Sequence, residues 1–285
     1  MNQRIVVFVL CALCCAALTT EALAGGPFKL RMGLQQGKTY VYSDVVKADV
    51  TQEMMGQEMK SATLSTTVTR FVIEKATADA ITAVQSLDSA QVAVKNARMD
   101  TTMVLTDMIG KRSRITLSTM GKVIARAVID SIPQAGSPMR GATVRDAMRA
   151  HMFPEGPVAA GGTWNGTIAD TNEAMGGKMM TTSTITYTLV GEEQKAGHAC
   201  VKITYTGTVA IEGKGSMMGM QIFTEGKGNV TGTLWFDPAA GVTVVDDAKM
   251  ENDLTAAMTG QQNMTMPIST VAASTRTLRA VQDTK

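Results

Sequence analysis

The sequence predicts a mainly β protein, in which a large antiparallel meander sheet is either curved as a half-barrel or paired as a sandwich and carries one short amphipathic helix. Three observations lead to this fold class. Segments rich in Thr, Val and Ile recur along most of the chain, and many alternate apolar with polar residues, as half-buried strands do. Short turns containing Gly or Pro separate these segments. A helical pattern occurs in a single segment.

The N-terminus has the pattern of a cleaved signal peptide at 1–24. Arg4 supplies a positive charge, an apolar run too short for a comfortable membrane span follows, and the small residues Ala22 and Ala24 precede Gly25. None of the cysteines in this run directly follows a small residue, which the pattern of a lipid anchor requires. We therefore expect a periplasmic or secreted protein with no transmembrane segment after cleavage.

About eleven strands are predicted in the rest of the chain. They fall into two β-rich halves, 28–132 and 155–283, joined by the helical segment. Turns inside each half, such as "FDPAAG" at 236–241, predict consecutive hairpins and hence antiparallel rather than βαβ pairing. Since β sandwiches and barrels often exceed 200 residues as one unit, we predict a single domain over 25–285.

The predicted helix lies near 143–152, in "ATVRDAMRAHMFP". Thr143 is its N-cap and Pro154 its stop. One face of this helix is apolar apart from a histidine and is formed by Val144, Ala147, Met148, His151 and Met152. Such a helix either covers one end of the sheet or acts as a lid.

Methionine-rich segments with a central glycine occur four times, as "QEMMGQEMK" at 52–60 and later as "EAMGGKMM", "SMMGMQ" and "AMTGQQNM". Because strand-like segments lead into and out of each copy, each is predicted to be a hairpin tip. In the first copy, a turn centred on Gly56 and Gln57 would pair Met54 with Met59 across the hairpin.

Three interpretations of the 22 methionines remain open. They pack irregular gaps in a chain with only 4% aromatic residues, or they form a pliable apolar surface for ligands such as acyl chains, or their thioethers capture Cu(I). Against the third interpretation, Met217 and Met218 are adjacent and would point to opposite faces of a strand.

Motifs of catalysis are absent from the sequence. The two histidines, His151 and His198, form no HExxH pattern, and neither a GxSxG elbow nor zinc-type Cys/His spacing occurs. Asp246 and Asp247 are neighbours that would face opposite ways on a strand, as solvated edge charges. We therefore predict that the protein is not an enzyme and has no catalytic residue, no metal site and no cofactor.

Cysteine content and charge exclude further classes. After signal cleavage Cys200 is the single cysteine, so no intramolecular disulfide forms. A thiol beside potential cations is either reactive or an incidental half-buried strand residue. The net charge of +2 and the 45% hydrophobic content argue against a nucleic-acid partner.

The order of several motifs resembles an uncharacterised family of exported bacterial β-rich proteins. The motifs are "LQQGKTYVYS", "MMGQEM", "LSTMGKVI", "MFPEGPVAAGGTW", "TGTLWFDPAAG" and "PISTVAASTRTLRA", and they span essentially the whole mature chain. The architecture of that family is similar to the half-barrel carriers that move lipoproteins or lipids across the periplasm. The resemblance implies a curved sheet that holds acyl chains, and it implies no catalytic residues.

These observations predict an exported, non-catalytic protein that binds a lipid-like or other hydrophobic ligand. The residues predicted to line the site are Met54, Met59, Met148, Met152, Trp164 and Trp235. Two alternatives stay open: a structural or interaction module with an envelope protein as its partner, and a periplasmic Met-rich protein that binds Cu(I).

Overall fold

The computed structural model describes residues 26–54, 56–131, 151–174, 177–217, 220–259 and 263–284. Most of these residues lie in twelve strands: β1 Lys38–Met54, β2 Gln57–Ala76, β3 Ala80–Asn96, β4 Asp100–Val104, β5 Arg112–Ser118, β6 Val123–Val128, β7 Thr163–Ala174, β8 Gly177–Lys195, β9 His198–Met217, β10 Met220–Asp237, β11 Val242–Thr259 and β12 Met264–Asp283. The prediction of a mainly β protein is confirmed.

All twelve strands belong to one antiparallel sheet, in the order β6-β5-β3-β2-β1-β12-β11-β10-β9-β8-β7 with β4 paired to β3 beside this path. Within each half, neighbours in the sheet are consecutive in the chain with few exceptions, as expected for a meander. The first and last strands, β1 and β12, pair from Lys38 with Asp283 to Gln52 with Ile268. This pairing joins the two predicted halves into a single sheet.

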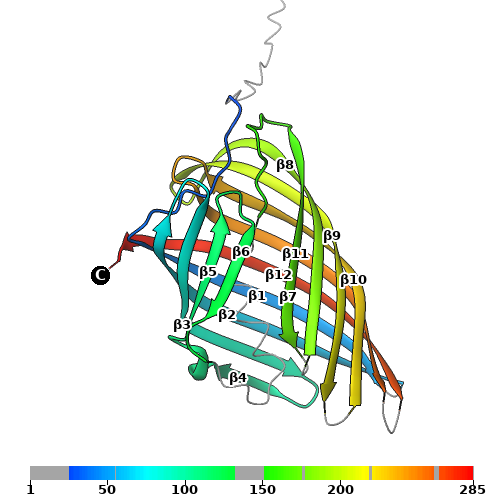
Figure 1. Cartoon of the computed structure of the whole chain (residues 1–285). Coiled ribbons are helices and arrows are strands. Elements are labelled where there is room, and N and C mark those ends of the chain that lie inside the picture. Colours follow the sequence, from blue (N-terminus) through cyan, green and yellow to red (C-terminus); the bar gives the residue numbers. More distant parts are fainter. Residues whose placement is uncertain are drawn as a thin grey trace, which may run out of the picture.

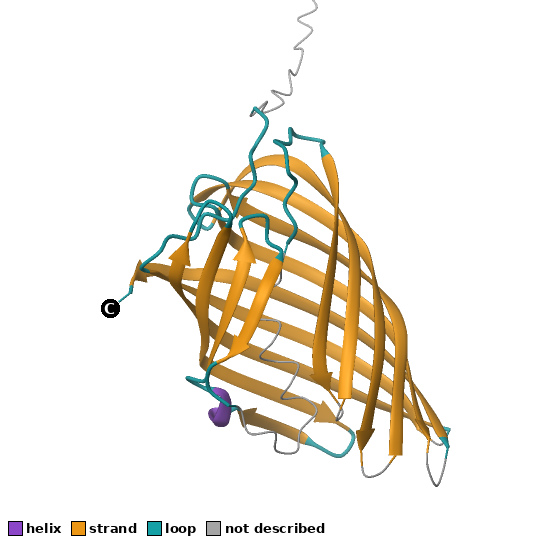
Figure 2. Ribbon diagram, in the orientation of Figure 1, coloured by secondary structure: helices purple, strands orange, loops and turns teal. Residues whose placement is uncertain are grey.

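The sheet curls into an open half-barrel rather than folding into a sandwich, and β5 to β8 lie in front of β1 and β12 in Figures 1 and 2. Glycines at inward positions of β10 allow this curvature. A Cβ atom on Gly228 would lie 1.9 Å from Oδ1 of Asn252, and one on Gly232 would lie 2.3 Å from Cζ of Tyr205. Side chains of neighbouring strands therefore fold over bare backbone where the sheet bends.

One end of the half-barrel, which we call the closed end, is covered by two irregular segments, 26–34 and 151–158. Phe28 and Val158 form an isolated bridge, and the amide of Met32 donates to the carbonyl of Thr119 at 2.7 Å. Under these segments lie two apolar clusters: one contains Tyr40, Phe71, Ile81 and Leu117, and the other contains Leu30, Phe153, Tyr187, Ile203 and Phe236. The core of the protein is therefore concentrated at the closed end.

The opposite end, which we call the open end, carries the methionine-rich hairpins. The strand ladders finish at Met54–Gln57, Ala174–Gly177, Met217–Met220 and Met258–Met264, so all four copies connect paired strands as predicted. The predicted register of the first copy is wrong, because Met59 lies opposite Gln52. Gly56 is the second residue of a two-residue loop and has a φ of 75°, which glycine adopts without steric cost.

The predicted helix is not confirmed. Residues 143–150 lie outside the described part of the chain, and His151 and Met152 are irregular. Pro154 disfavours the helical conformation at Phe153, whose amide instead donates to the carbonyl of Met120 at 2.9 Å. Helix in the described ranges is limited to one 3₁₀ turn, η1, Thr106–Met108.

Within the described ranges, we find no helix that is both long and apolar enough to cross a membrane. The predicted signal peptide lies outside these ranges.

Candidate ligand-binding site

The inner face of the half-barrel is a wall of apolar, hydroxyl and a few amide side chains. On β12 it consists of Met264, Met266, Ile268, Thr270, Ala272 and Ser274, which are half-buried and alternate with exposed residues. The ladders place Ala48 of β1 and Met250 of β11 on either side of Ala272. We call the inward side chains of β1, β2, β3 and β8 to β12, from the hairpin tips up to the row of charges described below, the concave wall.

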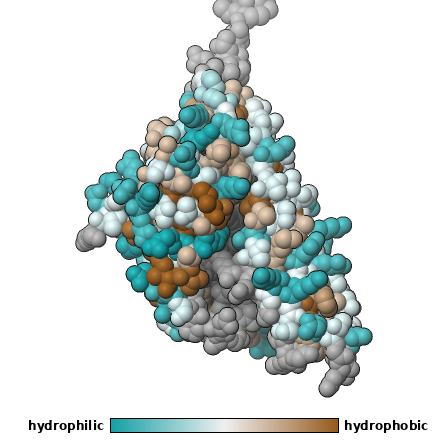
Figure 3. Space-filling model, viewed as in Figure 1, coloured by the Kyte–Doolittle hydropathy of each residue, from teal (hydrophilic) through white to brown (hydrophobic). Residues whose placement is uncertain are grey.

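No charged side chain lies on the described part of the concave wall. The outward positions of the same strands carry many charges: Lys47, Asp49, Lys60, Lys95, Glu212, Lys214, Glu225, Lys227, Lys249, Glu251 and Asp253. Successive residues of a strand point to opposite faces, so the charged residues all lie on the outer, solvent-facing side and the uncharged residues line the inner side. Figure 3 shows the molecule hollowed between the β5–β6 side and the β7–β8 side.

A row of buried charges ends the concave wall toward the closed end. Asp44, Arg276 and Asp246 lie opposite one another on β1, β12 and β11. Nε of Arg276 donates to Oδ1 of Asp44 at 2.7 Å, and the hydroxyl of Tyr205 donates to Oδ1 of Asp246 at 2.8 Å. With Asp246 1% exposed and Arg276 6% exposed, these charges depend on one another and on their hydrogen bonds for compensation.

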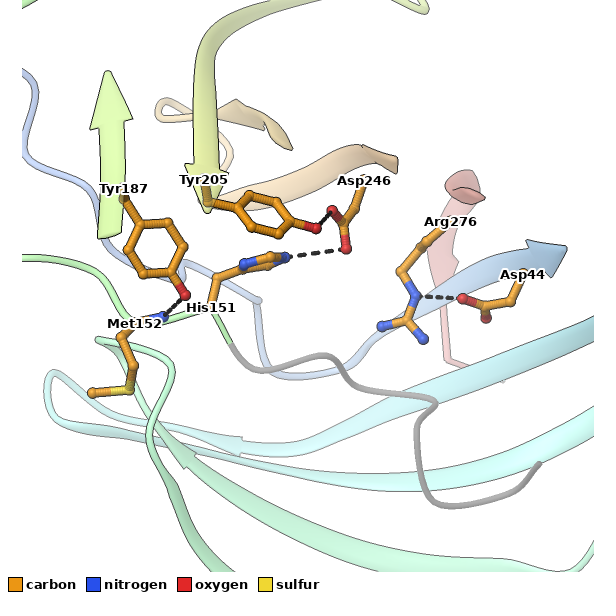
Figure 4. Close-up of polar contacts among 7 residues, drawn as sticks. All are labelled: Asp44, His151, Met152, Tyr187, Tyr205, Asp246 and Arg276. Carbon is orange, nitrogen blue, oxygen red and sulfur yellow. Dashed lines mark hydrogen bonds and ion pairs between the residues drawn. The ribbon is translucent and has the colours of Figure 1, made fainter. Parts of the chain in front are cut away.

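The irregular segment 151–154 lies beside this row, and its His151 points toward Asp246 (Figure 4). Nε2 of His151 lies 3.1 Å from Oδ2 of Asp246, while the amide of Met152 donates to the hydroxyl of Tyr187 at 3.4 Å. The carbonyl of Met152 accepts a 2.7 Å bond from Nε1 of Trp164, whose ring stacks on that of Tyr187 at 5.3 Å. Aromatic contacts and hydrogen bonds therefore hold this segment against β7, β8 and β11.

The closed end leaves little internal space. A cavity of about 40 Å³ lies between the two core clusters and is bounded by Tyr42, Phe71, His151, Asp246 and Arg276 among others. This volume suits a few water molecules, each needing roughly 10–15 Å³, and not an organic ligand. This cavity is therefore too small to be the site of a hydrophobic ligand.

Two buried tyrosines at the closed end, Tyr42 and Tyr187, stay protonated at neutral pH. Burial raises the pKa of Tyr187 to about 12 and also raises the pKa of Tyr42. Both phenols are protonated at neutral pH: that of Tyr42 donates to the carbonyl of Thr243 at 3.1 Å, and that of Tyr187 accepts from the amide of Met152. These groups fix the closed end and offer no nucleophile.

Cys200 lies on the outer face of β9, in a small cluster with Trp235, Val244 and Val245. Burial raises the pKa of its thiol to about 11, so it is a protonated thiol at neutral pH. Within the described residues, no three His, Cys, Asp or Glu side chains gather as a metal-ligand set.

The structure brings three of the predicted site residues to the inner side. Met59 is an inward residue of β2 near the open end, whereas Met152 and Trp164 pack against the second core cluster at the closed end. Trp235 is buried on the outer face, with Nζ of Lys195 at 3.8 Å from its ring centre. Met148 and the side chain of Met54 lie outside the described part of the structure.

Sequence reasoning missed the row of buried charges. It treated Asp246 as a solvated edge charge, but β11 is an interior strand and Asp246 is buried, while Asp247 faces outward and accepts from Thr275 at 2.7 Å. The sequence did contain one indication of this burial, because the segments next to Asp246 are rich in apolar and aromatic residues. Asp44 and Arg276 are 232 positions apart in the chain, so nothing local indicated their contact.

Comparison with known proteins gives similarity at the level of the fold only. No family model matches the sequence, and no curated protein matches it. A structure on lipid–protein interactions in lipovitellin is 10% identical, covering 88% of this chain and 26% of that chain, with a TM-score of 0.47. A protein of Bacteroides fragilis NCTC 9343 with a YmcC-like fold is 11% identical over 90% of this chain and 100% of that chain, with a TM-score of 0.28.

This chain thus spans about a quarter of the lipovitellin chain that it matches. At these identities and TM-scores the similarities assign no function. The predicted family resemblance stays a prediction, and any functional conclusion depends on the concave wall.

Proposed function

We propose that the protein is an exported, non-catalytic binding protein whose concave wall holds a lipid-like or other hydrophobic ligand. The observation that carries the proposal is the wall itself, an inward surface without charge that is only half-buried along β1 and β12. A half-exposed apolar surface of this extent is costly in water unless a ligand or partner covers it.

The dimensions of the wall fit long apolar chains. From Arg276 to Met264 on β12, at a rise of ~3.3 Å per residue, the wall is roughly 40 Å long. This length exceeds the ~30 Å hydrocarbon core that two opposed lipid leaflets form. Methionines toward the open end, such as Met59 and Met258, add side chains that adapt to ligands of different shape.

An envelope interaction module is the second candidate, and the free edges of the sheet favour it. β6 and β7 each pair on one side only. On β6, Ile124 and Val128 are 57% and 71% exposed, which is unusual for apolar residues of an edge strand. A partner that adds a strand at this edge would cover them.

Ligand retention by the purified protein tests the proposal. The mature chain is isolated from the periplasm and analysed by native mass spectrometry and organic extraction, and its affinity for a fluorescent fatty acid is measured. We expect a stoichiometric apolar adduct and saturable probe binding. A bare mass together with no probe binding would overturn the proposal and favour the interaction module.

Two adjacent alanines of β12 supply matched variants. Ala272 faces inward between Ala48 and Met250, whereas Ala273 is exposed on the outer face. Ala272→Glu places a charge in the wall, where an apolar ligand would leave it without water, so we expect a loss of probe affinity of at least ~10-fold. Ala273→Glu is expected to bind as the wild type. Equal binding by both variants would place the ligand elsewhere.

A further inference from the structure

Four methionines come together on the inner face at the open end. They are Met220 on β10, Met258 on β11, and Met264 and Met266 on β12. All four are half-buried. We call this set the methionine patch; Met220, Met258 and Met264 come from two of the four methionine-rich segments, and Met266 follows the last of them.

The strand ladders place Met258 at the centre of the patch. Met264 lies directly opposite it on β12, and Ile222 lies directly opposite it on β10. Met266 and Met220 are the diagonal neighbours, each two residues along the adjacent strand on the same face. Cβ atoms of directly opposed residues are ~4.5–5.5 Å apart and diagonal neighbours are ~7–8 Å apart, both within reach of long side chains.

This arrangement removes the objection to metal binding that the sequence alone raises. Neighbours in the chain point to opposite faces of a strand, but cross-strand neighbours point to the same face. Methionine is unbranched with three rotatable bonds, so the sulfurs of Met258, Met264 and Met266, which are direct, diagonal and i, i+2 neighbours, can turn toward a common point. Among the described residues of β10 and β11, these rows otherwise present Ile222, Thr224 and Ala256 inward, and no carboxylate or amine.

We propose that the methionine patch is a Cu(I) site, with Met258, Met264 and Met266 as ligands. Soft thioethers select Cu(I) over hard divalent cations, which prefer carboxylate and carbonyl oxygens. An uncharged, half-buried surround suits a monovalent ion held by neutral ligands. The proposal is independent of the hydrophobic ligand, because it needs the sulfur atoms and not merely the apolar surface.

Replacement of methionine by leucine separates the two functions. The exchange conserves volume and hydrophobicity but removes the thioether. The mature protein is titrated anaerobically with Cu(I) kept reduced by ascorbate, in competition with bicinchoninate. We expect one tightly bound Cu(I) per chain in the wild type, and no competitive binding in the triple variant Met258→Leu/Met264→Leu/Met266→Leu.

The single variant Met258→Leu is expected to lose at least ~10-fold in affinity, since even partners outside the ligand shell contribute ~10–100-fold to metal affinity. Met180→Leu is the matched control, because Met180 is 44% exposed on the outer face of β8. This control should bind Cu(I) as the wild type, as should Cys200→Ser. Met180→Leu and Cys200→Ser should also bind the fluorescent fatty acid as the wild type does, because neither residue lies on the concave wall.

Three results would overturn the Cu(I) site while leaving the hydrophobic ligand intact. These are a wild type that does not compete with bicinchoninate, a triple variant that retains its affinity, and a loss of binding in Cys200→Ser alone. Conversely, loss of fatty-acid binding in Ala272→Glu has no bearing on Cu(I), because Ala272 lies outside the patch.

Discussion

At the scale of single residues, buried polar groups specify the closed end. Asp246 is the acceptor shared by His151 and Tyr205, so it connects the irregular segment 151–154 to strands β9 and β11. Each partner is itself buried or covered by neighbouring rings, with the ring of His151 5.2 Å from that of Tyr205. Removing the shared acceptor would therefore leave two buried donors unsatisfied.

We expect Asp246→Ala to lower the free energy of unfolding by about 3 kcal/mol, because each buried donor left without a partner costs about 1–3 kcal/mol. Urea unfolding followed by circular dichroism measures the loss. Asp247→Ala is the matched control, since Asp247 faces outward and accepts one bond from Thr275, and it should cost less than about 1 kcal/mol. Similar losses in both variants would contradict the role assigned to Asp246.

A second carboxylate, Asp237, makes stability depend on pH. Burial alone would raise its pKa, but the amides of Ala240 and Ala239 and the ring of His198 outweigh burial and hold the pKa below its ordinary value of 3.8. Its Oδ1 accepts from both amides at 2.9–3.0 Å in the turn before β11. The ionised form is therefore stabilised in the folded state.

Because the folded pKa is depressed, this stabilisation is fully present above the unfolded value near 3.8 and is lost as the pH falls through the folded pKa. Asp237→Asn should lower the free energy of unfolding by about 1.5 kcal/mol at pH 7, because the hydrogen bonds that the carboxylate accepts would then end on a neutral amide. The difference from the wild type should shrink toward pH 3. Chemical unfolding at both pH values measures it. A difference that stays constant would show that the charge contributes nothing.

At the scale of elements, glycine placement shapes the strands. Inward glycines on β9 and β10 let neighbouring strands approach and let longer side chains cover the backbone, as Tyr205 does at Gly232. Gly213 differs, because a Cβ there would meet its nearest atoms at 3.5 Å, an ordinary contact. Gly232 is therefore required by the close approach of its neighbours, whereas Gly213 could be replaced by a residue with a Cβ atom.

We expect Gly232→Ala to destabilise the protein by about 1–3 kcal/mol, because the new Cβ would lie 2.3 Å from the hydroxyl oxygen of Tyr205 and would displace it from Asp246. Gly213→Ala should be neutral or should stabilise the protein by up to ~1 kcal/mol, because alanine lowers the conformational entropy of the unfolded chain. Thermal and urea unfolding compare the two. Equal effects would mean that the approach of strands at Gly232 is not needed.

At the scale of the whole molecule, the pairing of β1 with β12 decides the architecture. Each half alone is a meander with two open edges, and joining them along most of the length of both strands gives one sheet wide enough to curl. The closed end is then filled by the segments 26–34 and 151–158, and the open end is left to the hairpins. This asymmetry creates both a core and a hollow face.

The sequence by itself determined the strands, the antiparallel meander and the positions of the methionine-rich hairpins, because residue alternation and turn chemistry are local. The joining of the halves, the half-barrel, the buried row of Asp44, Arg276 and Asp246, and the methionine patch were decided only by the tertiary structure. These features depend on register between strands that are distant in the chain. A shift of one residue would have sent every side chain of a strand to the opposite face.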